Sequence, residues 1–254
     1  MADKSTDIFT PEDLDQRLPK TAQVYELLRH AIVSCRLPPG EVLNEKELSR
    51  QLDISRTPIR EAILQLAAQK LIVIKSSSGT YVSPIRLNDV LEGQLVRDGL
   101  EARTVALAAR YCTSEYASRL DVSLYQQRLA AKAKDTDQFY ALDEEFHKLI
   151  CDCSGFPSLW TLLNGAKGQL DRVRRLAFPV QAHFDEVVKE HTALINAIKG
   201  HDEERAVVLM RTHVDAIETL EHLIRKRRNL FHGDVTQDLQ RFKDVLRTAQ
   251  HVDE

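Results

Sequence analysis

The stretch from Leu37 to Val82, LPPGEVLNEKELSRQLDISRTPIREAILQLAAQKLIVIKSSSGTYV, decides the fold of the N-terminal part of this chain. It predicts two short helices, a tight turn and a third helix, followed by two β-rich runs at 71–74 and 80–82. A Ser/Gly turn separates the two runs, so they form a hairpin with that turn at its tip. Asn44, followed by Glu47, marks a helix start in the manner of a capping box.

The apolar residues after Ser55 recur at the spacing of one helix face. They are Ile59, Ala62, Ile63, Leu66 and Ala67. Arg56, Thr57 and Arg60 fall outside that face, within about one turn of one another. Ser55 is a suitable N-cap, and Pro58 is tolerated in a first helical turn. The pattern predicts a helix that packs on a core and offers its cationic start to a DNA groove, as in a winged helix-turn-helix.

Residues 20–86 resemble the DNA-binding domain of the GntR superfamily of bacterial transcription regulators. The matching residues are 37–40, Leu43, Glu45, 47–48, 55–58, 60–62, Leu66, Leu71 and Gly79. There are two departures: Asp53-Ile54 replaces the family's usual Gly-Val, and the wing tip is rich in Ser where many members have Arg. The resemblance implies contacts with double-stranded operator DNA. The residues expected there are Lys46, Ser55, Arg56, Thr57, Arg60 and Gly79.

Charge is unevenly distributed along the 254 residues, whose net charge is −3. Residues 20–86 contain 10 Lys/Arg and 6 Asp/Glu, a net charge of +4, which leaves −7 for the remainder. A basic N-terminal segment followed by an acidic remainder fits a DNA-binding domain joined to a domain that does not bind DNA. The alternative is an accidental charge asymmetry of a solvated helical surface.

Three features predict a cytoplasmic protein without contact to a membrane. No run of about 18 apolar residues is present, so no membrane-spanning helix is expected. The first 17 residues are polar and acidic, unlike a signal peptide. Four cysteines in a chain of this size favour a reducing compartment. Cys151 and Cys153 are predicted to be ordinary thiols at a helix end, with a soft-metal or redox pair as the alternative.

After Leu87 the strand signals disappear and apolar residues recur at helical spacing. Helices are predicted near 88–112, 114–134, 136–153, 157–177, 182–199 and 202–229, which make an all-α bundle with room for a core cavity. The expected fold is therefore mainly α. Its parts are a disordered tail (1–19), a winged helix-turn-helix (20–84), a helical effector-binding and dimerisation domain (85–229) and a C-terminal extension (230–254), in which an amphipathic helix is predicted.

One carboxylate and three imidazoles stand out within the predicted bundle. Asp143 and His147 are four residues apart on one helix, so their side chains point the same way. His191 and His213 belong to two later helices. All four lie at or beside apolar stripes, so they can converge inside the bundle and hold a divalent metal ion. From the residues alone, the alternative is an ordinary hydrogen bond between Asp143 and His147.

Residues 90–226 resemble the FCD domain, the ligand-sensing half of the FadR branch of the GntR superfamily. The resemblance rests on 142–147, 190–191, 194–202, Ala206 and 210–213. It implies a divalent metal ion (Zn, Ni or Mn) bound by Asp143, His147, His191 and His213. It also implies that Arg97 lies near an effector cavity. A salt bridge with Glu101, four residues further on, is the alternative for Arg97.

The two resemblances together imply a transcription regulator, in particular a repressor, that binds its operator as a homodimer. A small carboxylate effector, held by the metal ion and a nearby cation, would control operator binding. A metal ion that only stabilises the bundle is an alternative to this direct role. Two rival functions are a metal-dependent hydrolase or lyase that activates water at the Asp/His site, and a DNA-binding protein without a ligand.

Overall fold

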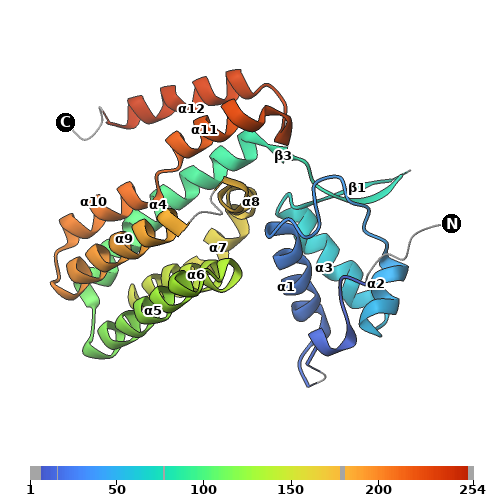
Figure 1. Ribbon diagram of the computed structural model, residues 1–254, viewed down its shortest axis with the longest axis horizontal. Coiled ribbons are helices and arrows are strands. Elements are labelled where there is room, and N and C mark those ends of the chain that lie inside the picture. The colour runs from blue at the N-terminus through green and yellow to red at the C-terminus, as the bar shows by residue number, and fades with distance from the viewer. Residues whose placement is uncertain (1–6, 16, 77, 178–180, 251–254) are drawn as a thin grey trace. The chain divides into compact units, whose positions relative to one another are not determined.

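The computed structural model describes residues 7–15, 17–76, 78–177 and 181–250, and only the backbone of 181–182 and 245–250. The chain divides into two compact units, residues 1–86 and 87–254. Figure 1 shows the helices and strands of each unit. Helices dominate both, which confirms the mainly α class expected from the sequence.

The N-terminal unit is a winged helix-turn-helix, as the sequence predicts. Its elements are the 3₁₀ helix η1 (Pro11–Asp13), helices α1 (Lys20–Val33), α2 (Glu45–Leu52) and α3 (Arg56–Ala68), and strands β1 (Ile72–Lys75), β2 (Gly79–Val82) and β3 (Ile85–Arg86). Strands β1 and β2 pair antiparallel, with Ile72 opposite Val82 and Lys75 opposite Gly79. This hairpin is the wing.

Local features fix the turn between α2 and α3. The Asn44 side chain caps α2 by accepting hydrogen bonds from the backbone N–H groups of Lys46 and Glu47, at 2.9 and 3.2 Å. Asp53 ends α2 in the left-handed conformation, with φ 51°. Glycine adopts this conformation without strain, which explains the Gly that the family usually has at this position. Helix α3 then packs against α1 and buries Ile59. Arg56 and Thr57, at the start of α3, remain exposed.

The expectation of a disordered tail over 1–19 is wrong for the residues that the structure describes. Phe9 and Leu14 are buried in the core of the N-terminal unit. The Phe9 N–H donates to the Gln51 side chain at 3.3 Å. Burial of the two apolar side chains offsets the entropy lost when this polar segment is ordered. Residues 1–6 and 16 lie outside the described part of the chain.

The C-terminal unit is a bundle of helices. Its elements are α4 (Leu87–Tyr111), α5 (Ser114–Ala133), α6 (Thr136–Cys153), α7 (Leu159–Ala166), α8 (Gly168–Ala177), α9 (Gln181–Lys199), α10 (Glu203–Val214), α11 (Ile217–Arg227), η2 (Arg228–Leu230), β4 (Phe231–His232) and α12 (Val235–Gln250). Helix α4 is central and contacts α6, α7, α8, α9, α10 and α12. Side chains of α4, α5, α6, α9 and α10 form an apolar core that includes Phe146, Leu194 and Met210.

The helix predicted over 157–177 is two helices, α7 and α8, which meet at Lys167. The Lys167 side chain is buried at the junction, with its Nζ 2.5 Å from a Glu144 carboxylate oxygen and 2.8 Å from one of Asp171. Gly93 of α4 lies against the same junction, and a Cβ there would be 3.0 Å from the Ala166 carbonyl oxygen. Tertiary packing, which local sequence does not encode, therefore sets this break.

The helix predicted over 202–229 is also divided, into α10 and α11. Gln94 of α4 donates from its side-chain nitrogen to the Val214 carbonyl oxygen at 2.8 Å. The Asp215 side chain accepts from the Ile217 N–H at 3.0 Å. These side-chain bonds satisfy backbone groups at the end of α10 and the start of α11, so the chain can turn directly after Val214.

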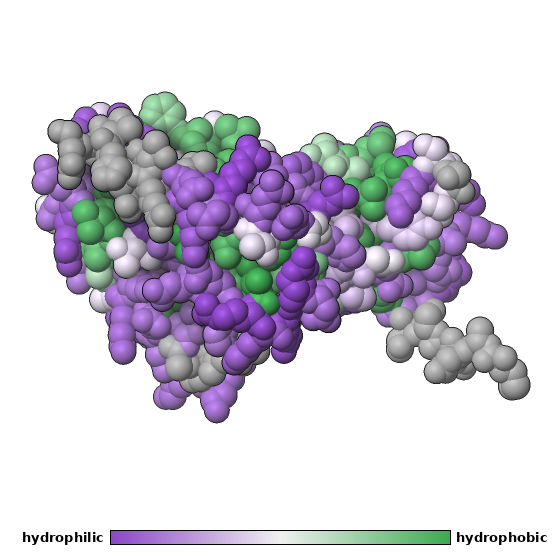
Figure 2. Space-filling model, turned by 90° about the horizontal axis from the view of Figure 1, so that it is seen from above, coloured by the Kyte–Doolittle hydropathy of each residue, from purple (hydrophilic) through white to green (hydrophobic). Residues whose placement is uncertain are grey.

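The C-terminal extension contains α12, in agreement with its apolar pattern. Val235 and Phe242 are buried and α12 contacts α4, so this helix packs on the bundle. Figure 2, which views the molecule from above, shows mostly hydrophilic residues on the helical unit, with apolar residues in small groups between them. Within the described ranges, no helix combines the length and the apolar character needed to cross a membrane.

Candidate metal centre

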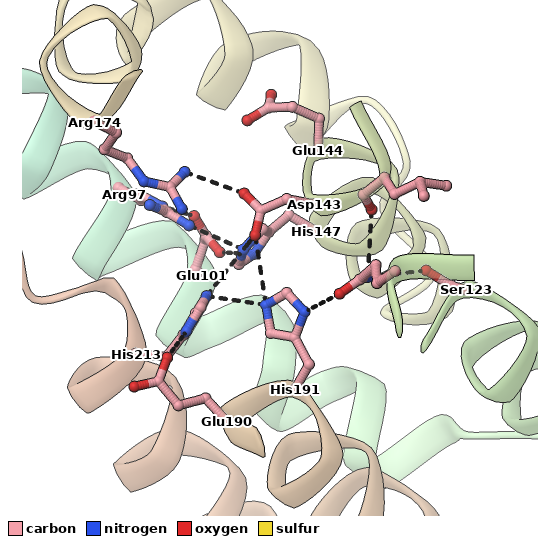
Figure 3. A network of polar contacts seen from close by, with 12 residues as sticks. Arg97, Glu101, Ser123, Asp143, Glu144, His147, Arg174, Glu190, His191 and His213 are labelled. Atoms are coloured by element: carbon pink, nitrogen blue, oxygen red, sulfur yellow. Dashed lines mark hydrogen bonds and ion pairs between the residues drawn. The ribbon is translucent and has the colours of Figure 1, made fainter. Parts of the chain in front are cut away.

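Three helices bring the four predicted ligands together (Figure 3). Helix α6 carries Asp143 and His147, α9 carries His191, and α10 carries His213. One ligand atom from each residue lies within 4.8 Å of the ligand atoms of the other three. Each of the four side chains is at most 2% exposed. The cluster is therefore a closed polar site inside an apolar bundle.

Each imidazole has an oxygen partner at its Nδ1 atom. These partners are Glu101 for His147, Gln127 for His191 at 2.7 Å, and Glu190 for His213 at 2.6 Å. A carboxylate or amide oxygen only accepts hydrogen bonds, so Nδ1 carries the proton and Nε2 keeps its lone pair. Oxygen partners of this kind orient the histidine ligands of metal ions and raise their basicity.

The three Nε2 atoms face one another. The Nε2 atom of His213 lies 3.2 Å from that of His191 and 3.2 Å from that of His147. Asp143 Oδ1 lies 3.6 Å from His191 Nε2, and no described residue donates a hydrogen bond to this oxygen. Buried lone pairs this close to one another repel unless a cation lies between them. The donor set, three imidazole nitrogens and one carboxylate oxygen, fits a divalent transition metal.

Burial and neighbouring charges keep His191 and His213 neutral and Asp143 ionised. Burial lowers the pKa of His191 and of His213 well below the usual range, and neighbouring imidazoles lower both further. Burial by itself raises the pKa of Asp143, but the Arg174 guanidinium and the imidazoles bring it well below its usual range. Metal ions bind neutral imidazole and ionised carboxylate, so these three side chains are in their binding form at neutral pH.

Two arginines lie beside the cluster. Arg97 Nε donates to a Glu101 carboxylate oxygen at 2.6 Å, and Arg97 Nη2 lies 2.9 Å from His147 Nε2. Arg174 Nη1 donates to Asp143 Oδ2 at 3.2 Å. The two interpretations of Arg97 are therefore compatible, because it forms the salt bridge with Glu101 and also reaches the ligand cluster.

A cavity of about 360 Å³ adjoins the cluster and is lined by Arg97, Arg174 and His213. Glu186, Glu190, Asp215 and Glu218 line the same cavity. Carboxylates repel an anion, whereas guanidinium groups bind it through paired N–H donors. An anionic ligand is therefore favoured only beside the two arginines.

Sequence reasoning missed Gln127, Glu190 and Arg174. Gln127 is on α5 and supports a ligand of α9, whereas Glu190 is on α9 and supports a ligand of α10. No spacing rule within one helix reveals partners that lie across helices. Arg174 is one of several arginines on α8, and only the packing of α8 against the bundle distinguishes it from the others.

The residues predicted to contact DNA are all exposed on the N-terminal unit. They are Lys46 on α2, Ser55, Arg56, Thr57 and Arg60 at the start of α3, and Gly79 in the wing. Arg60 Nη2 forms an ion pair with Glu45 Oε2 at 2.8 Å. Gly79 has φ 115°, a backbone conformation that a side chain would strain. These residues therefore belong to the helix start and wing that a winged helix-turn-helix offers to DNA.

Two family models match the chain. The model of the FCD domain matches residues 94–216, and that of the bacterial regulatory proteins of the gntR family matches residues 20–82. The HTH-type transcriptional repressor RspR of Escherichia coli (strain K12) is 32% identical over 213 residues, which cover 84% of this chain and 93% of that protein. The chain therefore belongs to the GntR family of bacterial transcriptional regulators and carries an FCD domain.

Other relatives agree with this assignment. The probable D-xylose utilization operon transcriptional repressor of Paenarthrobacter nicotinovorans is 28% identical and covers 79% of this chain and 89% of its own length. The solved structure of McbR/YncC from E. coli matches the fold with a TM-score of 0.72 at 23% identity, over 82% of this chain and 99% of that chain. The McbR/YncC match confirms the fold, and membership of the GntR family makes the protein a transcriptional regulator.

Proposed function

We propose that this regulator is a cytoplasmic, homodimeric repressor whose operator binding responds to a small carboxylate effector. The effector binds beside a divalent metal ion, Zn, Ni or Mn, which Asp143, His147, His191 and His213 hold. The observation that carries this proposal is the arrangement of the three imidazoles, whose Nε2 atoms face one another while oxygen partners occupy every Nδ1 atom. Such a metal ion would supply a Lewis-acidic binding point for a carboxylate oxygen.

The cavity beside the cluster supports the effector part of the proposal. Arg97 and Arg174 line it together with His213, so a carboxylate beside these arginines meets two guanidinium groups next to the proposed metal ligands. Arg97 is held by Glu101, and Arg174 is held by Asp143. Both cations are thus fixed in position before an effector binds, which lowers the entropic cost of binding.

The two units divide the work. Residues 20–84 bind operator DNA through Lys46, Ser55, Arg56, Thr57, Arg60 and Gly79, and residues 85–229 bind the effector and form the dimer. A single helix-turn-helix reads only a few base pairs, so a dimer on two half-sites provides the specificity that an operator needs. The extension over 230–254 packs on the bundle through α12.

Control of DNA binding requires that the effector bind more tightly to one arrangement of the dimer's two N-terminal units than to the other. A preference of about 1–3 kcal/mol changes operator affinity by 5–150-fold, which is enough for regulation. Repression is supported by the names of two relatives, each of which is called a repressor. In our proposal, effector binding releases the operator and so relieves repression.

Calorimetry on full-length protein, loaded with Zn²⁺ and stripped of metal, tests the proposal. A panel of small mono- and dicarboxylates is titrated into each form, and circular dichroism verifies that the stripped protein is folded. We expect one metal ion per chain and carboxylate binding only in the loaded form. A folded, metal-free protein that binds the same acid equally well would exclude the direct role of the metal ion, and a metal content near zero would exclude the site.

A further inference from the structure

Helix α5 carries a stripe of exposed residues that the metal site and the DNA surface do not use. Val122, Tyr125 and Leu129 are 57%, 61% and 49% exposed, respectively. Their spacing along the chain places them on one face of the helix, together with exposed Ser118 and Ala133. A row of large apolar side chains on one helix face is a feature of interaction surfaces, whereas single exposed apolar residues are common. We call Ser118, Val122, Tyr125, Leu129 and Ala133 the α5 stripe.

The α5 stripe is self-complementary. Val122 and Tyr125 lie at equal distances on either side of the peptide bond between Ser123 and Leu124, and so do Ser118 and Leu129. A two-fold axis through this point pairs Val122 with the partner's Tyr125, and Ser118 with the partner's Leu129. Each large side chain thus meets a different residue of the second copy, which is the property that a two-fold symmetric interface requires.

Charge follows the same symmetry. Glu115 and Lys132 are exposed at opposite ends of the same helix face, again at equal distances from the bond between Ser123 and Leu124. The axis that pairs Val122 with the partner's Tyr125 therefore also brings Glu115 beside the partner's Lys132, twice per dimer. A parallel arrangement would instead place like charges next to each other, so the antiparallel one is favoured.

A groove adjoins the α5 stripe. A groove of about 490 Å³ lies between α5 and α6 beside Val122 and is lined by both cations and anions, among them Arg119, Glu145 and Lys148. Helix α5 has 20 residues and is therefore about 30 Å long. We propose that the α5 stripe is the subunit interface, where α5 packs antiparallel on α5 of a second copy of this chain. This inference rests on the homodimer of the proposed function and names its surface.

The test compares two valines of nearly equal exposure. Val122 is 57% and Val208, on α10, is 56% exposed. Full-length Val122→Glu, Tyr125→Glu and Val208→Glu variants are loaded with Zn²⁺ and studied by sedimentation equilibrium. Circular dichroism and metal content verify their fold. We expect the wild type and Val208→Glu to be dimers and the two stripe variants to be monomers, with a rise of at least 100-fold in dimer Kd. A dimeric Val122→Glu/Tyr125→Glu double variant would overturn the interface.

A charge-reversal cycle tests the orientation. Glu115→Lys and Lys132→Glu should each raise the dimer Kd about tenfold, because the symmetric dimer contains this exposed pair twice. The double variant should return to the wild-type value. If the double variant instead raised the dimer Kd by the product of the two single-variant factors, the antiparallel pairing would be overturned.

DNA binding by the wild type separates this inference from the proposed function. If the wild type is a dimer that does not bind DNA from its own genome, and the stripe variants are monomers, the proposed function is contradicted but the interface is supported. If the wild type binds DNA as a dimer and the stripe variants are dimers as well, only the proposed interface is contradicted.

Discussion

The imidazoles of His191 and His213 face each other with their Nε2 atoms 3.2 Å apart, although they belong to two different helices. The Nδ1 atom on the far side of each ring has a hydrogen-bond partner. It is Gln127 of α5 for His191 and Glu190 of α9 for His213. The candidate metal site is thus built by two layers of residues, and the outer layer decides which nitrogen of each ring points inward. The outer layer can be tested without removing any ligand.

Replacement of Glu190 by Ala should weaken metal binding although all four ligands remain. The His213 ring loses the acceptor that holds its Nδ1 proton, and changes of this kind typically cost 10–100-fold in metal affinity. Glu186→Ala is the matched control, because Glu186 lies one turn earlier on α9 and lines the same cavity. Competition with a fluorescent zinc chelator measures both. Equal losses for the two variants would indicate a general charge effect and no specific role for Glu190.

Arg97 and Glu101 should behave as a buried pair. Both side chains are 3% exposed; burial raises the pKa of the Glu101 carboxyl, but the Arg97 guanidinium and His147 bring it below its usual range. Arg97→Met leaves a buried carboxylate with His147 alone and should cost about 3–5 kcal/mol in the free energy of unfolding. Arg97→Met/Glu101→Met removes both charges and should recover much of that loss. Urea denaturation of metal-free protein measures both variants, and a double variant less stable than the single one would contradict the pair.

Glu45 should restrain DNA binding through Arg60. The two side chains form an ion pair at the exposed start of α3, and a DNA contact by Arg60 must compete with it. Arg60→Ala should weaken operator binding by roughly 10–100-fold, as expected for a lost base contact. Glu45→Gln should strengthen binding, because it frees Arg60 and removes a negative charge near the phosphates. Fluorescence anisotropy at fixed salt measures both, and weaker binding by Glu45→Gln would show that the ion pair positions Arg60 for DNA.

Gly93 should tolerate no side chain, in contrast to Gly99 on the same helix. A Cβ at Gly93 would lie 3.0 Å from the Ala166 carbonyl oxygen and 3.2 Å from Lys167 Cα, whereas a Cβ at Gly99 meets no atom within 4 Å. Gly93→Ala should destabilise the protein by about 1–3 kcal/mol through overpacking. Gly99→Ala should stabilise it by about 0.5–1 kcal/mol through helix propensity. Thermal unfolding monitored by circular dichroism tests both signs.

The cysteines should differ in reactivity. Burial raises the pKa of Cys151 and of Cys153 to about 12, so almost no thiolate is present at pH 8. Cys35 and Cys112 are partly exposed. Iodoacetamide at pH 8 should therefore alkylate Cys35 and Cys112 first, as peptide mass spectrometry would show. In urea all four should react at similar rates. Early alkylation of Cys151 in the folded protein would mean that α6 opens locally.

Local sequence determined the winged helix-turn-helix. The cap at Asn44, the apolar face with Ile59, and the turn before Gly79 each act within a few residues, so their effects can be read from spacing. The ligand pair Asp143 and His147 was predictable for the same reason, because one helix turn separates them. His191 and His213 were singled out by their places beside the apolar stripes of two later helices, and the family resemblance implied that all four residues bind one metal ion.

Only the tertiary structure decided what surrounds those ligands. Gln127, Glu190 and Arg174 reach the site from neighbouring helices, and the breaks after Ala166 and Val214 depend on Gly93 and Gln94 of α4. Burial of Phe9 and Leu14, which orders a segment with a disordered composition, is likewise a long-range effect. Periodicity reports which face of a helix is apolar. Which other helix meets that face, and in what register, follows from packing of the whole bundle, so sequence patterns alone do not contain it.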